Sequence, residues 1–250
     1  MYVFVSLLSA WTVFLNLLVI ISISHFKKLH TPTNLIILSL AVADMLLGVL
    51  LPVEGSRQIE TCWYFGDTFC KLFLIIFGLV FSGSLSNLVL IAVDRYVAVC
   101  HPLQYPQKIT TTKTLGFAWF VTDLFVSFIF PSTLIITLYL RIFYVVQQQV
   151  KVINSLMKKR KSESKAALTL GIIVVVYMIC FIPYYICTMT VNSSTTINVL
   201  LLVLFTNSGL NPLIYALFYP WFKKTVKHIL TLKIFQPASS LVDIFTEHQL

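Results

Sequence analysis

The stretch from Cys70 to Pro102, CKLFLIIFGLVFSGSLSNLVLIAVDRYVAVCHP, is a long apolar run that ends in Asp94-Arg95-Tyr96. A helix needs about 20 apolar residues to cross a bilayer, so this run predicts a tilted transmembrane helix with a charged end. An Asp–Arg pair at that end lies where the membrane meets water, and it can exchange partners there at modest energetic cost. The pattern therefore indicates a switch at a membrane surface rather than a catalytic site.

The composition also indicates a membrane protein. The mean hydropathy is +0.90, and 58% of the residues are apolar. Only 11% are charged, against roughly 25% in soluble domains. The net charge of +9 is concentrated in short segments between apolar runs, which is typical of cytoplasmic loops and not of a nucleic-acid surface. Five cysteines without a CxxC pair predict no metal or redox site.

The apolar runs predict an all-α membrane protein that forms a single transmembrane domain over residues 1–250. The first run is long and has no small-residue cleavage site, so we interpret it as a spanning anchor and not as a signal peptide. Residues 219–232 mix aromatic and basic side chains and predict an amphipathic helix on the cytoplasmic surface. The predicted spans cover residues 2–24, 34–52, 70–99, 117–146, 166–189 and 197–218.

The charge of the connecting segments conflicts with the number of spans. The basic segments 25–33, 101–114 and 151–165 belong inside the cell, whereas the acidic segment 53–69 is expected to form an outside loop. Two inside segments must be separated by an even number of crossings, but only the apolar run 115–146 lies between the last two. At 1.5 Å per residue it is too long for one ordinary crossing and too short for two. Either one basic loop breaks the rule or a helix is missing.

Several polar residues and prolines interrupt the predicted spans. Asp44 lies in the middle of the second span, where a carboxylate is costly and is a functional candidate by default. Asn16 in the first span is interpreted either as a helix–helix hydrogen bond or as a functional residue. Pro183 and Pro212 are expected to kink the last two spans.

Several motifs follow one another along the chain: Asn16, Leu40-Ala41-Val42-Ala43-Asp44, Trp63, Cys70, Asp94-Arg95-Tyr96, Pro131, Tyr139 and Asn211-Pro212-Leu213-Ile214-Tyr215. The order of these motifs resembles that of a rhodopsin-like G-protein-coupled receptor. The closing stretch, residues 207–212 and 219–222, further resembles the trace amine-associated receptors. The resemblance implies a rhodopsin-like bundle in the plasma membrane, a small amine ligand, a stimulatory G protein that raises cyclic AMP, and a mostly olfactory role.

The resemblance also offers an explanation of the overlong run. Residues 110–117 are similar to the approach to the family's fourth helix, and residues 119–146 are similar to the fifth, with Pro131 and Tyr139 in the expected places. The fourth helix and the long second extracellular loop would then be absent, leaving six spans where the family has seven. Cys70, which the family ties by a disulfide to that loop, would have no partner in this chain.

An amine site is implied by the resemblance. Most amine receptors carry a carboxylate eighteen residues before the arginine that corresponds to Arg95, and here that position is Phe77, which offers only a cation–π face worth up to ~2 kcal/mol. Asp123, eight residues before Pro131, is similar in place to an acid of some fish trace amine receptors. We expect it to be the amine counter-ion, the alternative being a hydrated carboxylate at the membrane entry. The remaining pocket residues would be Phe77, Phe81, Phe181, Tyr184, Tyr185 and Phe205.

The resemblance implies two further sites. Glu163 would pair with Arg95 in a closed state that agonist opens, unless it is only a solvated charge among lysines. The switch would comprise Asp94, Arg95, Tyr96, Tyr139, Glu163, Asn211, Pro212 and Tyr215. A sodium ion, the one possible cofactor, would bind Asp44, Ser84, Asn207, Ser208 and Asn211, unless these form a polar network without an ion.

Two functional hypotheses follow. The chain is an amine-sensing receptor, or it is a truncated membrane protein that does not signal. The second would arise from gene decay, alternative splicing or an incomplete gene model, and it would be retained in the endoplasmic reticulum or act by pairing with full-length receptors. A transporter is less well supported because no repeated half is seen. No nucleophile, base and metal set converges, so the sequence does not predict an enzyme.

Overall fold

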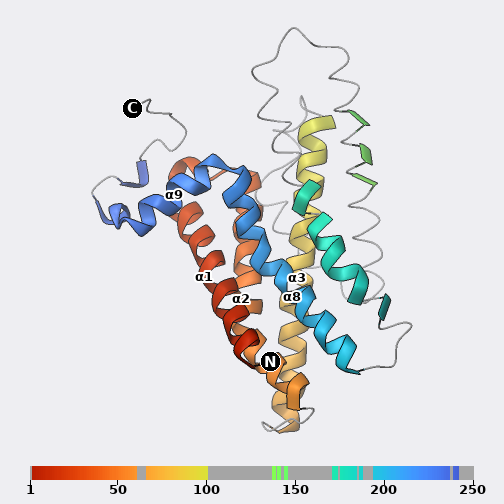
Figure 1. Ribbon diagram of the computed structural model, residues 1–250. Coiled ribbons are helices and arrows are strands. Elements are labelled where there is room, and N and C mark those ends of the chain that lie inside the picture. Colours follow the sequence, from red (N-terminus) through yellow and green to blue (C-terminus); the bar gives the residue numbers. More distant parts are fainter. Residues whose placement is uncertain are drawn as a thin grey trace.

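The structure is a computed structural model of the chain, shown in Figure 1. It describes residues 2–60, 66–100, 137–138, 140–141, 144–145, 171–173, 175–184, 186–187, 194–236 and 239–241. Within these residues the regular structure is helical. The long helices are α1 (Tyr2–His25), α2 (Pro32–Glu60), α3 (Asp67–Cys100) and α8 (Ser194–Phe218). Shorter ones are α9 (Pro220–Leu230), η1 (Lys27–Leu29), η3 (Lys233–Phe235) and η4 (Ser239–Leu241).

The long helices confirm the predicted all-α membrane fold. All four are long and apolar enough to cross a bilayer. The predicted span 166–189 is described in part, and its described residues 171–173, 175–184 and 186–187 are helical. The predicted span 117–146 lies outside the described residues except for three short helical pieces, so its number of crossings remains a prediction.

The structure corrects the prediction of an outside loop over 53–69. Helix α2 continues through Pro52 to Glu60, and α3 begins at Asp67. Proline removes one backbone donor, but the next turn is held by side-chain bonds along the helix. Ser56 Oγ donates to the carbonyl of Pro52 at 2.8 Å, and Glu54 binds both Arg57 and Gln58. Much of the acidic segment therefore extends the second and third helices.

The turn between α1 and α2 is closed by a cap. The amide of Asn34 donates to Thr31 Oγ1 at 3.3 Å, and Pro32 occupies the first helical position, where its missing N–H is not needed. This cap fixes where α2 begins, and so it fixes the position of Thr33 near the end of α3.

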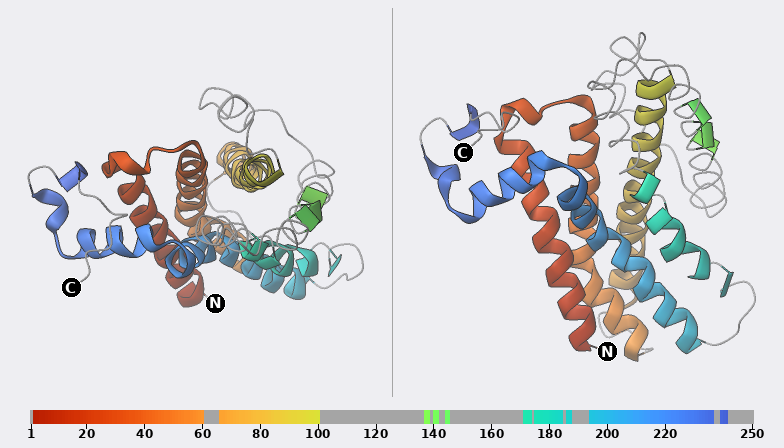
Figure 2. Two further views of the ribbon diagram at one scale, coloured as in Figure 1. Left: turned by 90° about the horizontal axis from the view of Figure 1, so that it is seen from above. Right: turned by 45° about the horizontal axis from the view of Figure 1, so that its top comes forward.

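The bundle is built around α2, which packs against α1 on one side and α3 on the other, while α8 packs against α1 and α2 (Figure 2). Helices α1 and α2 approach closely at Gly55, where an added Cβ would lie 2.7 Å from Val5 Cγ1. Many apolar side chains on the outside are exposed, Leu72, Ile75 and Leu79 among them, as expected of helices that face lipid.

Helix α9 turns away from α8 and runs across the end of α1 (Figure 1). The turn follows Tyr219, whose backbone is extended, and Pro220 starts the new helix. Trp221 and Phe222 are buried, whereas Lys223 and Lys227 are exposed. This amphipathic helix agrees with the one predicted for residues 219–232.

Candidate functional site

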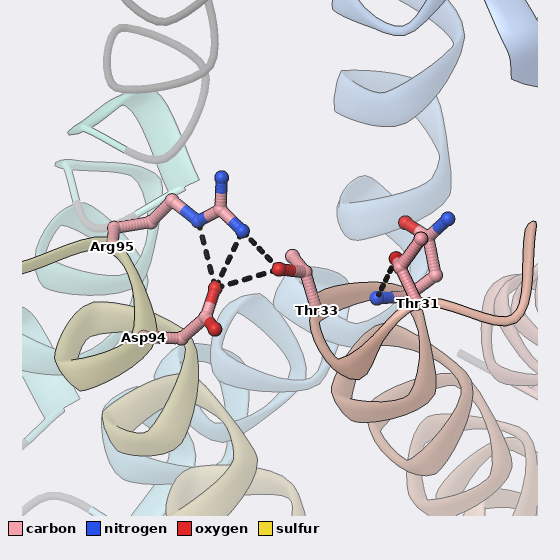
Figure 3. Close-up of polar contacts among 5 residues, drawn as sticks. Thr31, Thr33, Asp94 and Arg95 are labelled. Carbon is pink, nitrogen blue, oxygen red and sulfur yellow. Dashed lines mark hydrogen bonds and ion pairs between the residues drawn. The ribbon is translucent and has the colours of Figure 1, made fainter. Parts of the chain in front are cut away.

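The Asp94-Arg95 pair joins the end of α3 to the start of α2 (Figure 3). Arg95 Nε donates to Asp94 Oδ2 at 2.9 Å, and a second guanidinium nitrogen donates to the same oxygen. Thr33 Oγ1 accepts from Arg95 and donates to Asp94 Oδ2 at 2.8 Å. The Asp94 side chain is 1% exposed and that of Arg95 is 16% exposed. Sequence reasoning missed Thr33, although its place after a Thr-Pro helix start could have drawn attention to it.

Tyr219 lies near this pair, and Tyr215 lies one helical turn before Tyr219. The rings of Tyr215 and Tyr219 are 6.1 Å apart, and both hydroxyls are buried without a hydrogen-bond partner among the described residues. Burial raises the pKa of the Tyr219 phenol, while the Arg95 charge lowers it and that of Asp94 raises it, which places the phenol near the pair. Sequence reasoning missed Tyr219, which lies one helical turn after Tyr215.

The other predicted switch residues are only partly described. Tyr96 is half-buried in the last turns of α3, and Pro212 is buried within α8. Tyr139 and Glu163 lie outside the described residues, so the predicted pairing of Glu163 with Arg95 remains a prediction.

A buried polar cluster connects α1, α2, α3 and α8. Asp44 accepts hydrogen bonds from Ser84 Oγ at 2.7 Å and from Asn211 Nδ2 at 2.8 Å. Asn16 Nδ2 donates to the carbonyl of Ser208 at 3.0 Å, which is the interhelix bond considered for it. Asn207 is also buried. The structure thus places the five residues of the predicted sodium site in one buried region.

The atoms of this cluster fit a small hard cation. The side-chain oxygens of Asn16, Asn207 and Asn211 are buried and have no hydrogen-bond partner among the described residues. Together with the Asp44 carboxylate and the Ser84 hydroxyl, the cluster thus holds oxygen atoms of the kind that hard cations prefer. In the described part of the chain there is no cluster of three His, Cys, Asp or Glu side chains that could hold a transition metal.

The predicted aromatic pocket residues gather around the outer half of α3. Phe77 stacks on Phe81 at 6.4 Å and meets the edge of Phe205 at 5.5 Å. Phe81 in turn stacks on Phe181 at 5.8 Å. Tyr184, one turn beyond Phe181, is half-buried. Asp123 and Tyr185 lie outside the described residues, so the amine counter-ion remains a prediction.

A second charged cluster, which sequence reasoning missed, lies at the outer end of α2. Arg57 donates to both carboxylate oxygens of Glu54, at 2.9 and 2.6 Å, and Gln58 Nε2 donates to one of them at 2.7 Å. The Tyr184 phenol lies within electrostatic range of Glu54 and Arg57. Cys70 lies within electrostatic range of Arg57, and its thiol forms no disulfide with the described residues. The helical spacing Glu54, Arg57, Gln58 could have revealed the cluster if the segment had not been interpreted as a loop.

Comparison with known proteins identifies the family. The family described as "7 transmembrane receptor (rhodopsin family)" matches residues 15–125 and 117–215. Trace amine-associated receptor 13c of Danio rerio is 38% identical over 98% of this chain and 90% of its own length. Trace amine-associated receptor 1 of Macaca mulatta is 34% identical over 99% and 92%. Trace amine-associated receptor 6 of Mus musculus is 36% identical over 94% and 86%.

The alignments also bear on the interior of the chain. The two family matches meet at residues 117–125, within the overlong apolar run. The alignment with the Danio rerio receptor extends over 306 positions, whereas the chain has only 250 residues. Several dozen residues of that receptor therefore have no counterpart in this chain. The fold, the motifs and these matches together show that the chain belongs to the trace amine-associated receptor family of rhodopsin-like G-protein-coupled receptors, multi-pass membrane proteins that are receptors and not enzymes.

Proposed function

We propose that the chain is a plasma-membrane receptor that binds a small amine and signals through a stimulatory G protein. The observation that carries the proposal is the 34–38% identity to named trace amine-associated receptors over nearly the whole chain. The amine would be held by Asp123 as counter-ion and by the aromatic side chains around Phe77 and Phe181. A phenyl ring at position 77 would contribute by cation–π attraction and packing, because it carries no charge.

The coupling step would use the contacts at the end of α3. Arg95 is held by Asp94 and Thr33, so the charge of the guanidinium is balanced inside the bundle. A ligand that favours a different arrangement of the helices would release Arg95 toward the G protein and lower the population of this closed state. Glu163 would add a second carboxylate to the closed state. The hydroxyls of Tyr215 and Tyr219, which have no partner among the described residues, would gain partners when the helices move.

Sodium would act as an allosteric ion in this scheme. The Asp44 carboxylate, the Ser84 hydroxyl and the side chains of Asn207, Ser208 and Asn211 would hold it, joining three helices. An ion that binds the closed arrangement more tightly shifts the population toward that arrangement. Added sodium would therefore weaken agonist binding, and Asp44→Asn would remove that effect.

The experiment that tests the proposal measures cyclic AMP in cells that express the full chain with an N-terminal epitope tag. We expect primary amines such as 2-phenylethylamine to raise cyclic AMP, and we expect Asp123→Ala and Arg95→Ala each to abolish the response. Surface labelling of the tag provides the control for expression. A chain that reaches the surface and responds to none of the amines contradicts the proposal.

A second function is supported by the gap within the alignments. If the missing positions are absent from the real protein, the chain is a truncated membrane protein that does not signal, and it is retained in the endoplasmic reticulum or pairs with full-length receptors. Reading the full-length transcript and the genomic DNA across the codons for residues 114–122 decides between the two. An in-frame insert that encodes about 20 apolar residues and a cysteine-bearing loop supports the receptor. Its absence from both supports the truncated protein.

A further inference from the structure

We propose that Glu54 and Gln58, at the outer end of α2, form a second subsite for an ammonium group, and that Arg57 occupies this subsite when no ligand is bound. The inference rests on the proposed amine-receptor function. The subsite at the outer end of α2 is a second cation site, in addition to the expected counter-ion Asp123. The three residues that carry the subsite are described in full by the structure.

The first observation is the burial of a carboxylate together with its own cation. Glu54 is 3% exposed, and its two oxygens accept three hydrogen bonds, two from Arg57 and one from Gln58. A carboxylate this far from water requires a cation beside it. The Arg57 side chain, in contrast, is 37% exposed, so the cation is the member of the pair that can leave into water.

The second observation is an acceptor without a donor. The Gln58 amide nitrogen donates its hydrogen bond to Glu54, so Gln58 Oε1 lies near the carboxylate. This oxygen is buried and has no hydrogen-bond partner among the described residues. A buried acceptor left unpaired is unfavourable. Gln58 is only 7% exposed, so bulk water does not satisfy it. A primary ammonium group has three N–H donors, and it would bind both Glu54 and this oxygen.

The third observation is the place of the cluster in the bundle. Asn198 of α8 donates to the backbone carbonyl of Gln58 at 3.4 Å, and Tyr184 and Cys70 lie within electrostatic range of Arg57. Residues of α2 and α8 therefore meet here, and Cys70 of α3 and Tyr184 lie nearby. Tyr184 is one helical turn beyond Phe181, so the subsite lies directly outside the aromatic pocket.

Ligand binding is then an exchange of one cation for another. The ammonium group takes the place of the Arg57 guanidinium at Glu54, and Arg57 turns outward into water. The buried charge stays balanced because one positive group replaces another. Arg57 therefore competes with the ligand, and its removal leaves a vacant anionic site.

The test measures binding of 2-phenylethylamine to the purified full chain in lipid nanodiscs, with Arg57→Gln, Glu54→Gln and the control Lys71→Gln. Lys71 is exposed on α3, and its replacement removes one positive charge from the same end of the bundle. We expect Arg57→Gln to bind the amine at least about tenfold more tightly, Glu54→Gln at least about tenfold more weakly, and Lys71→Gln like the wild type. The melting temperature of each variant without ligand shows whether it is folded.

Arg57→Gln leaves the buried Glu54 carboxylate without its cation. The double variant Glu54→Gln/Arg57→Gln guards against misfolding from this cause, because no buried charge is left unpaired in it. We expect it to lose the gain seen in Arg57→Gln. The probe 3-phenylpropionate tests the opposite possibility, an anion bound by Arg57. Binding of this acid that Arg57→Gln abolishes, together with no gain in amine affinity, overturns the inference.

The outcomes separate the inference from the proposed function. If the wild type binds the amine and all four variants bind it equally, the subsite is wrong and the amine receptor stands. If neither the wild type nor Arg57→Gln binds any primary amine, both fail. A gain of amine binding in Arg57→Gln alone supports the subsite.

Discussion

Two arginine–carboxylate pairs lie at opposite ends of the bundle, and they differ in what they hold together. In each pair the carboxylate is nearly inaccessible and the arginine is the more exposed partner. At the inner end, Thr33 of α2 forms hydrogen bonds with both members of the Asp94–Arg95 pair on α3. These bonds to charged groups connect the two helices. At the outer end, Glu54, Arg57 and Gln58 all belong to α2. The inner pair therefore reports on the arrangement of helices, whereas the outer pair can be broken without separating them.

The largest effect is expected from removing the inner cation. Arg95→Leu leaves Asp94 buried without its cation and is expected to lower the free energy of unfolding by about 3–5 kcal/mol. Arg57→Leu, the matched change at the outer end, is expected to cost less because water replaces a guanidinium that is already 37% exposed. Chemical unfolding in detergent micelles measures both. Equal losses would show that the two pairs are equivalent, and Asp94→Asn in the Arg95→Leu background should recover much of the loss.

A smaller effect is expected from the uncharged members of the two clusters. Thr33→Val removes a hydroxyl that bonds to two charged groups, so a loss of about 1.5–3 kcal/mol in unfolding free energy is expected. Gln58→Leu is expected to cost less than about 1 kcal/mol, because Arg57 still binds Glu54 and an unpaired acceptor is removed. Thr33→Ser keeps the hydroxyl and serves as the control. A larger loss in Gln58→Leu than in Thr33→Val contradicts the comparison.

The smallest effect tests whether packing, rather than charge, holds the outer end to α1. A Cβ at Gly55 would lie 2.7 Å from Val5 Cγ1, so Gly55→Ala is expected to cost about 1–2 kcal/mol. At Gly78 of α3 no described residue lies within 4 Å of an added Cβ. Gly78→Ala is therefore expected to raise stability by up to about 1 kcal/mol, because alanine favours the helix. Melting temperatures should therefore shift in opposite directions. A rise in both variants would mean that α1 and α2 are not in close contact at Gly55.

Particular residues show where prediction from sequence succeeded and where it stopped. The spans at α1, α2, α3 and α8 follow from long, predominantly apolar runs, because a bilayer imposes a length that can be counted. The segment after Pro52 was expected to be an outside loop because of its acidic residues, but the side-chain bonds of Glu54 and Ser56 keep its first part helical. Because the segment was interpreted as a loop, the helical spacing of Glu54, Arg57 and Gln58 was not recognised as a cluster.

The candidate sites divide in the same way. The sequence by itself determined the membrane fold, the family and the residue types at Asp44, Arg95 and Asn211, because apolar length and motif order are properties of the chain alone. Only the tertiary structure decided that Asp44 bonds to Ser84 and Asn211 and that Thr33 bonds to the Arg95 pair. It also decided that Gln58, bonded to Glu54, keeps an oxygen without a partner among the described residues. The physical reason is that a hydrogen bond depends on distances of about 3 Å between atoms that are often far apart in sequence, and only the packing of the helices sets those distances.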